Sequence, residues 1–543
     1  MTLTLHKYIF RELFRVFLLT LIALTLILSL GSILQPIQQY GAGPRQVMIF
    51  MFYFLPITLT FVLPMAALFA GALVYGRFTS DNELDACRAS GISILSLVLP
   101  GLLLAIVVAI SNLFLSFYVM PTFVQLAEKS LKADIKQMLF RSLEQKGYYQ
   151  IPGYEDYLLY ADYADARNDT LYGVVLTRVE GIQIKEINTT ESAKIKIVPH
   201  EQSNEIQITP HNIYRFSTDH AVKVSSTVVT TEFGSLLADN IAFKKLDEMR
   251  EIKNDLTKFA PIAKSARDTL TQLTIELLAF DIRNNVEESI QTDPNSNSLS
   301  QMRFELAGEP NSVRFTLSHM TLLKNQINFS GDIDFIESDT ASGRTIHHFK
   351  SKDASLRIES NLLEHTLAMD LRNATDPETG EIKMWHSVTG LKVPRNIERT
   401  IDQFNTSKGS INAMKLASGV TDVPGFAAGP ELAELEGALK SDILNAQADM
   451  KAEIHSRLVF GLGCILMIMI GIGLGILKRG GHLLSAFGAS CVPAAILVVC
   501  IMSGKQLTEN LGAQTVSGIT IMWAGFGTLC LIALSIYYYL LKN

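Results

Sequence analysis

Hydrophobic residues gather near the two ends of this 543-residue chain, whereas its middle is polar. A helix needs about twenty apolar residues to cross a bilayer. The pattern predicts six such spans: Leu13–Leu34, Val47–Tyr75, Ile94–Met120, Leu458–Leu477, Leu483–Met502 and Val516–Leu541. We therefore expect a membrane helical bundle, with three transmembrane helices in 1–121 and three in 456–543, on either side of a soluble region, 122–455.

The first apolar run, Phe17–Leu34, follows Lys7, Arg11 and Arg15, an arrangement that also occurs in signal peptides. We reject that reading because the run is long and because Gln35-Pro36 is a poor cleavage site.

Basic residues indicate how the spans are oriented. With a cytoplasmic N-terminus, the short outside loops contain only Arg45 and Lys505. The inside segments then contain Lys7, Arg11, Arg15, Arg77, Arg88, Lys478, Arg479 and Lys542. The positive-inside rule therefore predicts that both termini and the polar stretch Ser80–Ser93 are cytoplasmic, and that 122–455 lies outside the cytoplasm.

Prolines and glycines modify the spans. Pro56, Pro64 and Pro100 lie inside predicted helices, so neighbouring helices must supply hydrogen bonds to the carbonyl groups that they free. Five glycines of the fourth span indicate close helix packing: Gly461, Gly463, Gly471, Gly473 and Gly475. The middle of every span lacks Asp, Glu and Lys, which disfavours an ion-coupled transporter.

In the middle region, alternation of apolar and polar residues predicts strands in 148–235, including Lys194–Val198, Glu205–Thr209 and Val222–Ser226. We expect an all-β, jelly-roll-like domain there. Helical periodicity follows in 236–300 and indicates an inserted hairpin. A second β stretch occupies 301–395, and a helix at 430–455 leads into the fourth span. Whether the two β stretches form one domain or two is left open.

Composition narrows the function further. The net charge of −6 combines basic ends with an acidic middle, which argues against nucleic acid as a partner. The middle has no cysteine, and hence no disulfide or cysteine-based zinc site. His347 and His348 are adjacent on a predicted strand and so point to opposite faces, unlike a metal pair. We identify no catalytic set, metal site or cofactor motif, so we predict that the chain is not an enzyme.

The stretch Ser80–Ser93 predicts a short polar helix between the second and third spans. Ser80 and Glu83 have the spacing of a capping box, and Gly91 is suited to the left-handed turn that ends a helix. Such a helix is too short to span a bilayer, so it must lie on one membrane face.

Residues 55–93 carry a specific pattern: Leu55-Pro56, Leu63-Pro-Met-Ala-Ala-Leu68, Tyr75-Gly-Arg77, Asp81-Asn-Glu-Leu84 and Arg88-Ala-Ser-Gly-Ile-Ser93. A weaker match occurs at Glu453-Ile-His-Ser-Arg457. With the layout of three spans, an outer β domain and three spans, this pattern resembles the LptF/LptG family of lipopolysaccharide-export permeases. The resemblance covers the membrane part and the first β stretch; the hairpin and second β stretch look like insertions.

The resemblance implies a bacterial inner-membrane subunit of an ABC transporter that extracts lipopolysaccharide or a related glycolipid. Its partners would be a second permease of the family, a cytoplasmic ATPase dimer and a periplasmic bridge protein. The ATPase would contact the short helix at Glu83, Leu84, Arg88 and Gly91. The first span of one subunit and the fifth of the other would form a lateral gate for lipid, here involving Ile33, Leu34, Ile37 and Pro493.

Two other functions remain open. The chain is alternatively a membrane-anchored scaffold or sensor whose outer domain binds a partner, or a permease for another lipid or a lipoprotein. A scaffold needs no helix for ATPase docking, so co-purification of a nucleotide-hydrolysing subunit separates the first alternative from export.

Overall fold

A computed structural model describes residues 2–40, 44–150, 157–180, 183–199, 204–217, 221–224, 229–233, 240–292, 302–323, 326–361, 364–406, 410–419, 423–477, 483–510 and 515–542. Contacts divide the chain into two compact units. Unit 1 combines Met1–Arg250 with Asn445–Asn543, and unit 2 is Glu251–Leu444.

The helices of unit 1 lie where the hydropathy pattern places them but extend beyond the apolar runs. They are α1 (Thr2–Tyr40), α2 (Pro44–Ser80), α3 (Glu83–Ala89), α4 (Ile94–Phe114), the π-helix η1 (Leu115–Val119), α5 (Met120–Lys146), the C-terminal part of α10 (Pro430–Leu477), α11 (Leu483–Asn510) and α12 (Thr515–Lys542). Among the described residues, five helices are long and apolar enough to cross a membrane. The predicted fifth span lies in α11, whose described apolar part, Val492–Thr508, is shorter, so the count of six spans is not confirmed.

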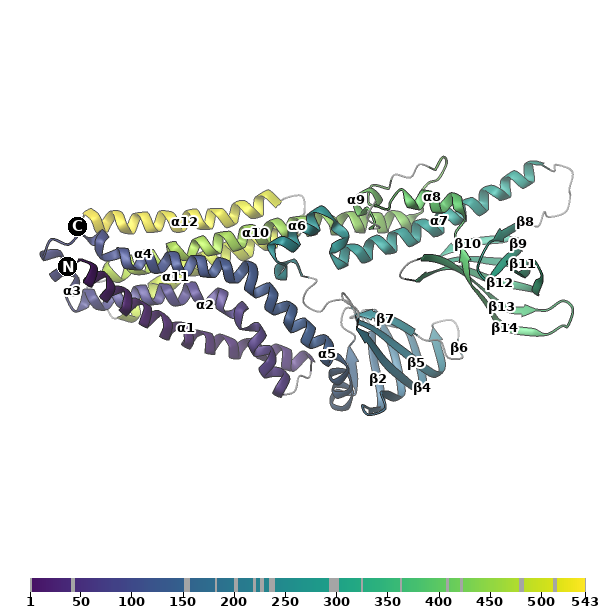
Figure 1. Ribbon diagram of the computed structural model, residues 1–543, viewed down its shortest axis with the longest axis horizontal. Coiled ribbons are helices and arrows are strands. Elements are labelled where there is room, and N and C mark those ends of the chain that lie inside the picture. Colours follow the sequence, from purple (N-terminus) through teal and green to yellow (C-terminus); the bar gives the residue numbers. More distant parts are fainter. Residues whose placement is uncertain are drawn as a thin grey trace. The chain divides into compact units, whose positions relative to one another are not determined.

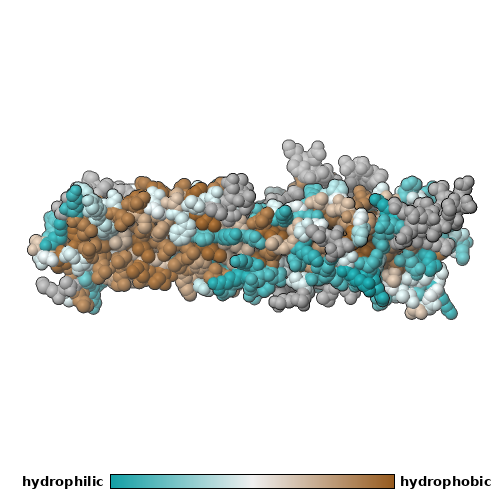
Figure 2. Space-filling model, turned by 90° about the horizontal axis from the view of Figure 1, so that it is seen from above, coloured by the Kyte–Doolittle hydropathy of each residue, from teal (hydrophilic) through white to brown (hydrophobic). Residues whose placement is uncertain are grey.

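The long helices of unit 1 run lengthwise beside one another, and both termini lie at the same end of this bundle as α3 (Figure 1). Hydrophobic residues cover the visible face of the bundle (Figure 2). The predicted topology places both termini and the short polar helix on the same side of the membrane, so they have to lie at one end of the bundle.

The glycines of α10 confirm the prediction of close packing. A Cβ atom added at Gly471 would lie 2.7 Å from the carbonyl oxygen of Leu68, and one at Gly475 would lie 2.8 Å from that of Ala72. Both acceptors belong to α2, so the backbones of α2 and α10 approach each other as only small residues allow.

Pro64 confirms the expectation for kinked spans. It has no N–H group, so the carbonyl of Thr60 lacks its helical donor. Asn112 of α4 supplies one: its Nδ2 atom lies 2.6 Å from the carbonyl oxygen of Thr60.

A first antiparallel sheet follows α5. Its described strands are β1 (Tyr148–Gln150), β2 (Tyr157–Asp165), β3 (Thr170–Glu180), β4 (Gln183–Pro199), β5 (Asn204–Ser217), β6 (Ala221–Val224) and β7 (Val229–Phe233). They pair in chain order from β1 to β6, and β7 also pairs with β5. Leu139, Phe140 and Leu143 of α5 pack with the sheet's apolar side chains. This order is that of a meander, and the jelly roll is not confirmed.

Helical elements then precede the second sheet: η2 (Ile241–Phe243), α6 (Leu246–Asn254), η3 (Leu256–Lys258) and α7 (Ala260–Thr292). In unit 2, α7 lies along the N-terminal part of α10, where Ser265 Oγ donates to Asp442 Oδ2 at 2.7 Å. The Glu276 carboxylate accepts the Gly429 N–H at 2.7 Å just before α10 begins. α7 therefore packs along the N-terminal part of α10, whereas the predicted hairpin has both of its helices within 236–300.

The second sheet belongs to unit 2, so the described strands form two separate sheets. Its strands are β8 (Met302–Leu306), β9 (Asn311–Leu317), β10 (His319–Leu323), β11 (Gln326–Asp339), β12 (Thr345–Asn361), β13 (Glu364–Thr375) and β14 (Ile382–Lys392). They pair in the order β14-β13-β12-β11-β9-β8, with β10 on β11. Phe315, Phe329, Phe335 and Phe349 are buried in its core. Two short helices follow, α8 (Arg395–Asp402) and α9 (Ala413–Leu416).

Candidate functional site

The short polar helix exists, but its predicted capping box is wrong. Ser80 is the last residue of α2, and α3 begins after Asn82, whose backbone is left-handed (φ 56°) and whose side chain caps nothing. The N–H of Asp81 still bonds to the carbonyl of Arg77 at 2.9 Å, so the α2 helix continues through the serine. A Ser-x-x-Glu pattern cannot distinguish the last residue of one helix from the first of the next.

The C-terminal signal of α3 is confirmed. Gly91 has φ +83°, and its N–H donates to the carbonyl of Arg88 at 2.9 Å. The N–H of Ile92 donates to the carbonyl of Cys87 at 3.2 Å. These two bonds form a Schellman motif, which requires the left-handed residue that glycine provides.

Leu84 anchors α3, with Cys87 packed beside it against the core. Leu84 is only 5% exposed and packs into the core of the bundle. It lines a small pocket with Tyr8, Tyr75 and Leu97. Glu83 and Gly91 are exposed, and Arg88 is half-buried. The structure thus uses Leu84 to hold α3 on the bundle and leaves a polar surface above it.

The residues predicted for the lipid path are in the expected helices. Ile33, Leu34 and Ile37 belong to α1, but their side chains lie outside the described part of the structure. Pro493 lies inside α11 and is buried. The described apolar stretch of α1 is mostly exposed, so this helix has a large apolar surface that the rest of the chain does not cover.

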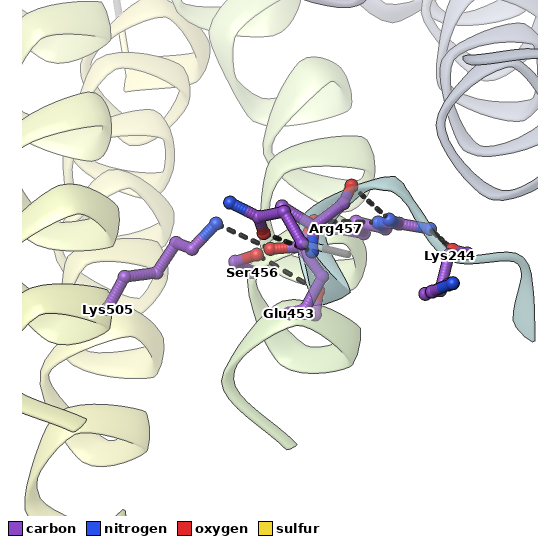
Figure 3. A network of polar contacts seen from close by, with 7 residues as sticks. Lys244, Glu453, Ser456, Arg457 and Lys505 are labelled. Atoms are coloured by element: carbon purple, nitrogen blue, oxygen red, sulfur yellow. Dashed lines mark hydrogen bonds and ion pairs between the residues drawn. The ribbon is translucent and has the colours of Figure 1, made fainter. Parts of the chain in front are cut away.

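A buried ionic cluster lies where α10 meets its apolar stretch (Figure 3). Glu453 Oε1 accepts a hydrogen bond from Arg457 Nε at 2.8 Å, one helical turn away. Its other oxygen, Oε2, accepts one from Lys505 Nζ of α11 at 2.5 Å. The Glu453 and Arg457 side chains are 8% and 3% exposed, whereas that of Lys505 is 29% exposed. One carboxylate therefore bridges two helices through two cations.

Arg457 extends the cluster to the segment that follows the first sheet. It donates to the carbonyl oxygens of Ala242 at 2.8 Å and Lys244 at 3.3 Å. Its guanidinium also lies 5.3 Å from the ring centroid of Phe117 in η1. A single side chain thus connects α10 with η1 and with the η2 segment that follows the first sheet.

The hydropathy pattern does not predict this cluster, because Lys505 lies beyond the apolar run of the fifth span and is expected in a loop. In the structure α11 continues to Asn510, which brings Lys505 beside Glu453. The available signal was the pair Glu453 and Arg457 at i,i+4 just before an apolar run, since buried charges need partners.

The adjacent histidines of β12, His347 and His348, contact different residues, as expected for neighbours on a strand. His348 Nε2 lies 2.7 Å from Asp334 Oδ1, whereas the ring of His347 stacks on Phe349 with centroids 5.4 Å apart. Among the described residues, no group of three or more His, Cys, Asp or Glu side chains is arranged to hold a metal ion.

Comparison with known proteins extends the sequence pattern to almost the whole chain. The family model described as lipopolysaccharide export system permease LptF/LptG matches residues 7–541. A search among curated proteins finds no match. The family match reaches well beyond the membrane part and first β stretch that carry the resemblance in the sequence.

Proposed function

Because the chain belongs to the LptF/LptG family of lipopolysaccharide export permeases, we propose that it is the membrane subunit of an ABC transporter that extracts lipopolysaccharide, or a related glycolipid, from the bacterial inner membrane. The observation that carries this proposal is the family match over residues 7–541. ATP hydrolysis then belongs to a separate cytoplasmic ATPase dimer, and a second permease of the family completes the membrane part.

We place the ATPase contact at α3. Glu83, Arg88 and Gly91 provide the docking surface, and Leu84 transmits its movement because its side chain is embedded in the bundle. The position of α3 at the end of the bundle that holds both termini supports a shared cytoplasmic side (Figure 1).

We assign lipid entry to α1 and α11. The hydroxyls of Thr20 and Thr25 donate to carbonyls of α1 itself, at 2.8 and 2.6 Å, and so do not hold this part of α1 to its neighbours. Helices in a bilayer have little hydrophobic drive to associate. An exposed helix of this kind separates from a partner subunit at low cost, which suits a lateral gate between Ile33, Leu34 and Ile37 and the fifth span of the partner permease. Pro493 of this chain's α11 then belongs to the second gate, opposite the partner's first span.

The first sheet is the proposed exit route. Apolar side chains of its strands form a core. An edge strand such as β1 has a neighbour on one side, and a further β-strand can pair with its other side. A periplasmic bridge protein that adds strands to such an edge would receive the lipid across the aqueous gap.

Co-purification tests the proposal. The tagged chain, expressed in its own host, should bring down a nucleotide-hydrolysing subunit and a homologous permease, and mass spectrometry should detect a bound glycolipid. Recovery of the chain with no ATPase would favour the scaffold or sensor, and a bound lipid of another class would favour the other permease.

The docking surface has its own test. Glu83→Gln removes a charge and keeps the size of the side chain, while Asp85 still places a negative charge in the first turn of α3, and it should lower lipid extraction by the assembled complex several-fold. Asp81→Asn is the matched control, because Asp81 is exposed beside α3. Equal activities of the two variants would remove Glu83 from the docking surface.

A further inference from the structure

Two side chains join α2 to α4 by hydrogen bonds to backbone carbonyls. Tyr75 Oη donates to the carbonyl oxygen of Leu97 at 2.7 Å, and Asn112 Nδ2 donates to that of Thr60 at 2.6 Å. Tyr75 is fully buried and Asn112 is 1% exposed. Such bonds persist in an apolar environment because no water competes for them.

The two bonds have the same antiparallel register. Thr60 and Tyr75 are fifteen residues apart on α2, as are Leu97 and Asn112 on α4. At 1.5 Å per residue the bonds lie about 22 Å apart along the helices. Two attachments at this separation prevent both sliding and relative rotation of the pair, whereas one would act as a pivot.

A proline and a glycine lie at the two attachments. Pro64 leaves the Thr60 carbonyl without its helical donor, so this oxygen is available to Asn112. Gly101 lies beside the Tyr75 hydroxyl: a Cβ atom there would make an ordinary contact with Tyr75 Oη at 3.5 Å but would lie 2.2 Å from Ile472 Cδ1, so this glycine makes room for Ile472 of α10.

The connection between these helices is α3. The chain passes from the end of α2 at Ser80 through α3 to the start of α4 at Ile94. Leu84 of α3 lines the same small pocket as Tyr75 and Leu97, the two residues of the nearer attachment. A displacement of α3 therefore acts directly on the point where α2 and α4 are joined.

Polar contacts also join the start of α1 to α2 and α4. His6 Nε2 lies 3.1 Å from Ser96 Oγ, and Glu12 Oε1 lies 3.1 Å from Arg77 Nη1. Farther along, Thr20 and Thr25 bond within α1.

We propose that Tyr75 and Asn112 are positioning residues that make α2 and α4 one rigid lever, which α3 moves as a unit against the middle of α1. This inference rests on the proposed function, in which an ATPase acts on α3. On this proposal, two buried hydrogen bonds, and not apolar packing alone, transmit the movement of α3 to α2 and α4.

Spin labels on the complete transporter test the lever. Exposed positions for the labels are Phe61 on α2, Ile110 on α4 and Ile22 on α1. Distances are measured without nucleotide and with ATP trapped by vanadate. We expect the Phe61–Ile110 distance to stay constant and the Phe61–Ile22 distance to change. A change of Phe61–Ile110 as large as that of Phe61–Ile22, or no change in either distance, would overturn the lever.

Variants then test the two residues. Tyr75→Phe and Asn112→Leu, combined, should broaden the Phe61–Ile110 distribution and lower the lipid extracted per ATP at least threefold while ATP hydrolysis continues. Tyr75→Phe alone loses only a hydroxyl and keeps the test valid if the double variant does not fold; it should show the same effects to a smaller extent. Asn112→Gln, which retains a donor, should restore part of the coupling.

Thr20→Val is the control, because it removes a hydrogen bond that is internal to α1. A narrow distribution with wild-type coupling in Tyr75→Phe, and in the double variant where it folds, would reject the proposed role of these residues. If the wild-type complex neither hydrolyses ATP nor extracts lipid, the proposed function fails instead, and the two failures are thereby distinguished.

Discussion

Glu337 of β11 and His386 of β14 meet inside the second sheet, with Glu337 Oε2 and His386 Nε2 2.9 Å apart. Asn311 Nδ2 donates to the other oxygen of Glu337 at 2.5 Å, and the His386 ring lies 5.3 Å from that of His347. The carboxylate is almost fully buried. The contacts of His386 connect β14 with β11 and β12, which are not its neighbours in the sheet, so they help to fix its curvature.

This contact predicts a pH-dependent stability of unit 2. Burial acts to raise the pKa of Glu337, but hydrogen bonds from His386 and Asn311, with the positive charge of His386 and His347, prevail and hold the pKa below its usual range. A lowered folded-state pKa contributes stability that is present above the unfolded value, about 4.3. That stability is lost as the pH falls through the lower pKa of the folded state.

Glu337→Gln should therefore lower the free energy of unfolding of unit 2 at pH 7 by about 1–3 kcal/mol, and the difference from wild type should shrink toward pH 3. Fluorescence of Trp385 during urea unfolding measures it in a Trp523→Phe background, since the chain has two tryptophans. Glu305→Gln is the control, because Glu305 is exposed in a surface pair with Arg314. A difference that does not vary with pH would contradict the role assigned to ionised Glu337.

The contact of α2 with α10 predicts that Gly475→Ala destabilises the bundle. The added Cβ atom would lie 2.8 Å from the Ala72 carbonyl oxygen and 3.0 Å from the Gly76 nitrogen, both rigid backbone atoms. We expect a loss of about 1–3 kcal/mol, measured as a lower midpoint of thermal unfolding in detergent. Gly527→Ala in α12 meets no atom within 4 Å and should be neutral or slightly stabilising. Equal midpoints for the two variants would show that the helices separate easily here.

The ionic cluster predicts an order among its variants. Glu453→Gln leaves the buried guanidinium of Arg457 and the ammonium of Lys505 without a carboxylate, which should cost about 3–5 kcal/mol. Lys505→Met should cost less, because Lys505 is partly exposed and Arg457 keeps its pair. Thermal unfolding of the purified protein measures both, and the reverse order would mean that Arg457 is satisfied by the Ala242 and Lys244 carbonyls alone.

The topology predicts opposite labelling of two engineered cysteines. In a variant without native cysteines, Ser441→Cys should react with an impermeant thiol reagent in intact cells, whereas Asp81→Cys should react only after lysis. Both positions are exposed, so access to the reagent depends on the membrane and not on burial. The inverse pattern would reverse the orientation of the bundle.

The sequence predicted features that depend on local chemistry. Apolar runs located the long helices, and Gly91 located the end of α3, because desolvation and a left-handed backbone each restrict which residues are possible. Features that depend on distant residues were not predicted. Ser80 and Glu83 have the spacing of a capping box, yet the turn at Asn82 separates them. Lys505 became part of a site only when α11 extended past its apolar run to meet Glu453.

The paired attachments of α2 to α4 restrict how the chain can change in length. Inserting one residue between Thr60 and Tyr75 would turn the remainder of α2 by about 100° and shift it by about 1.5 Å, so the two hydrogen bonds could no longer form together. The same insertion between Asp81 and Ser93 would leave both bonds intact. We therefore expect insertions and deletions among relatives to be absent from the two fifteen-residue stretches and to be tolerated in the connection at the end of the bundle.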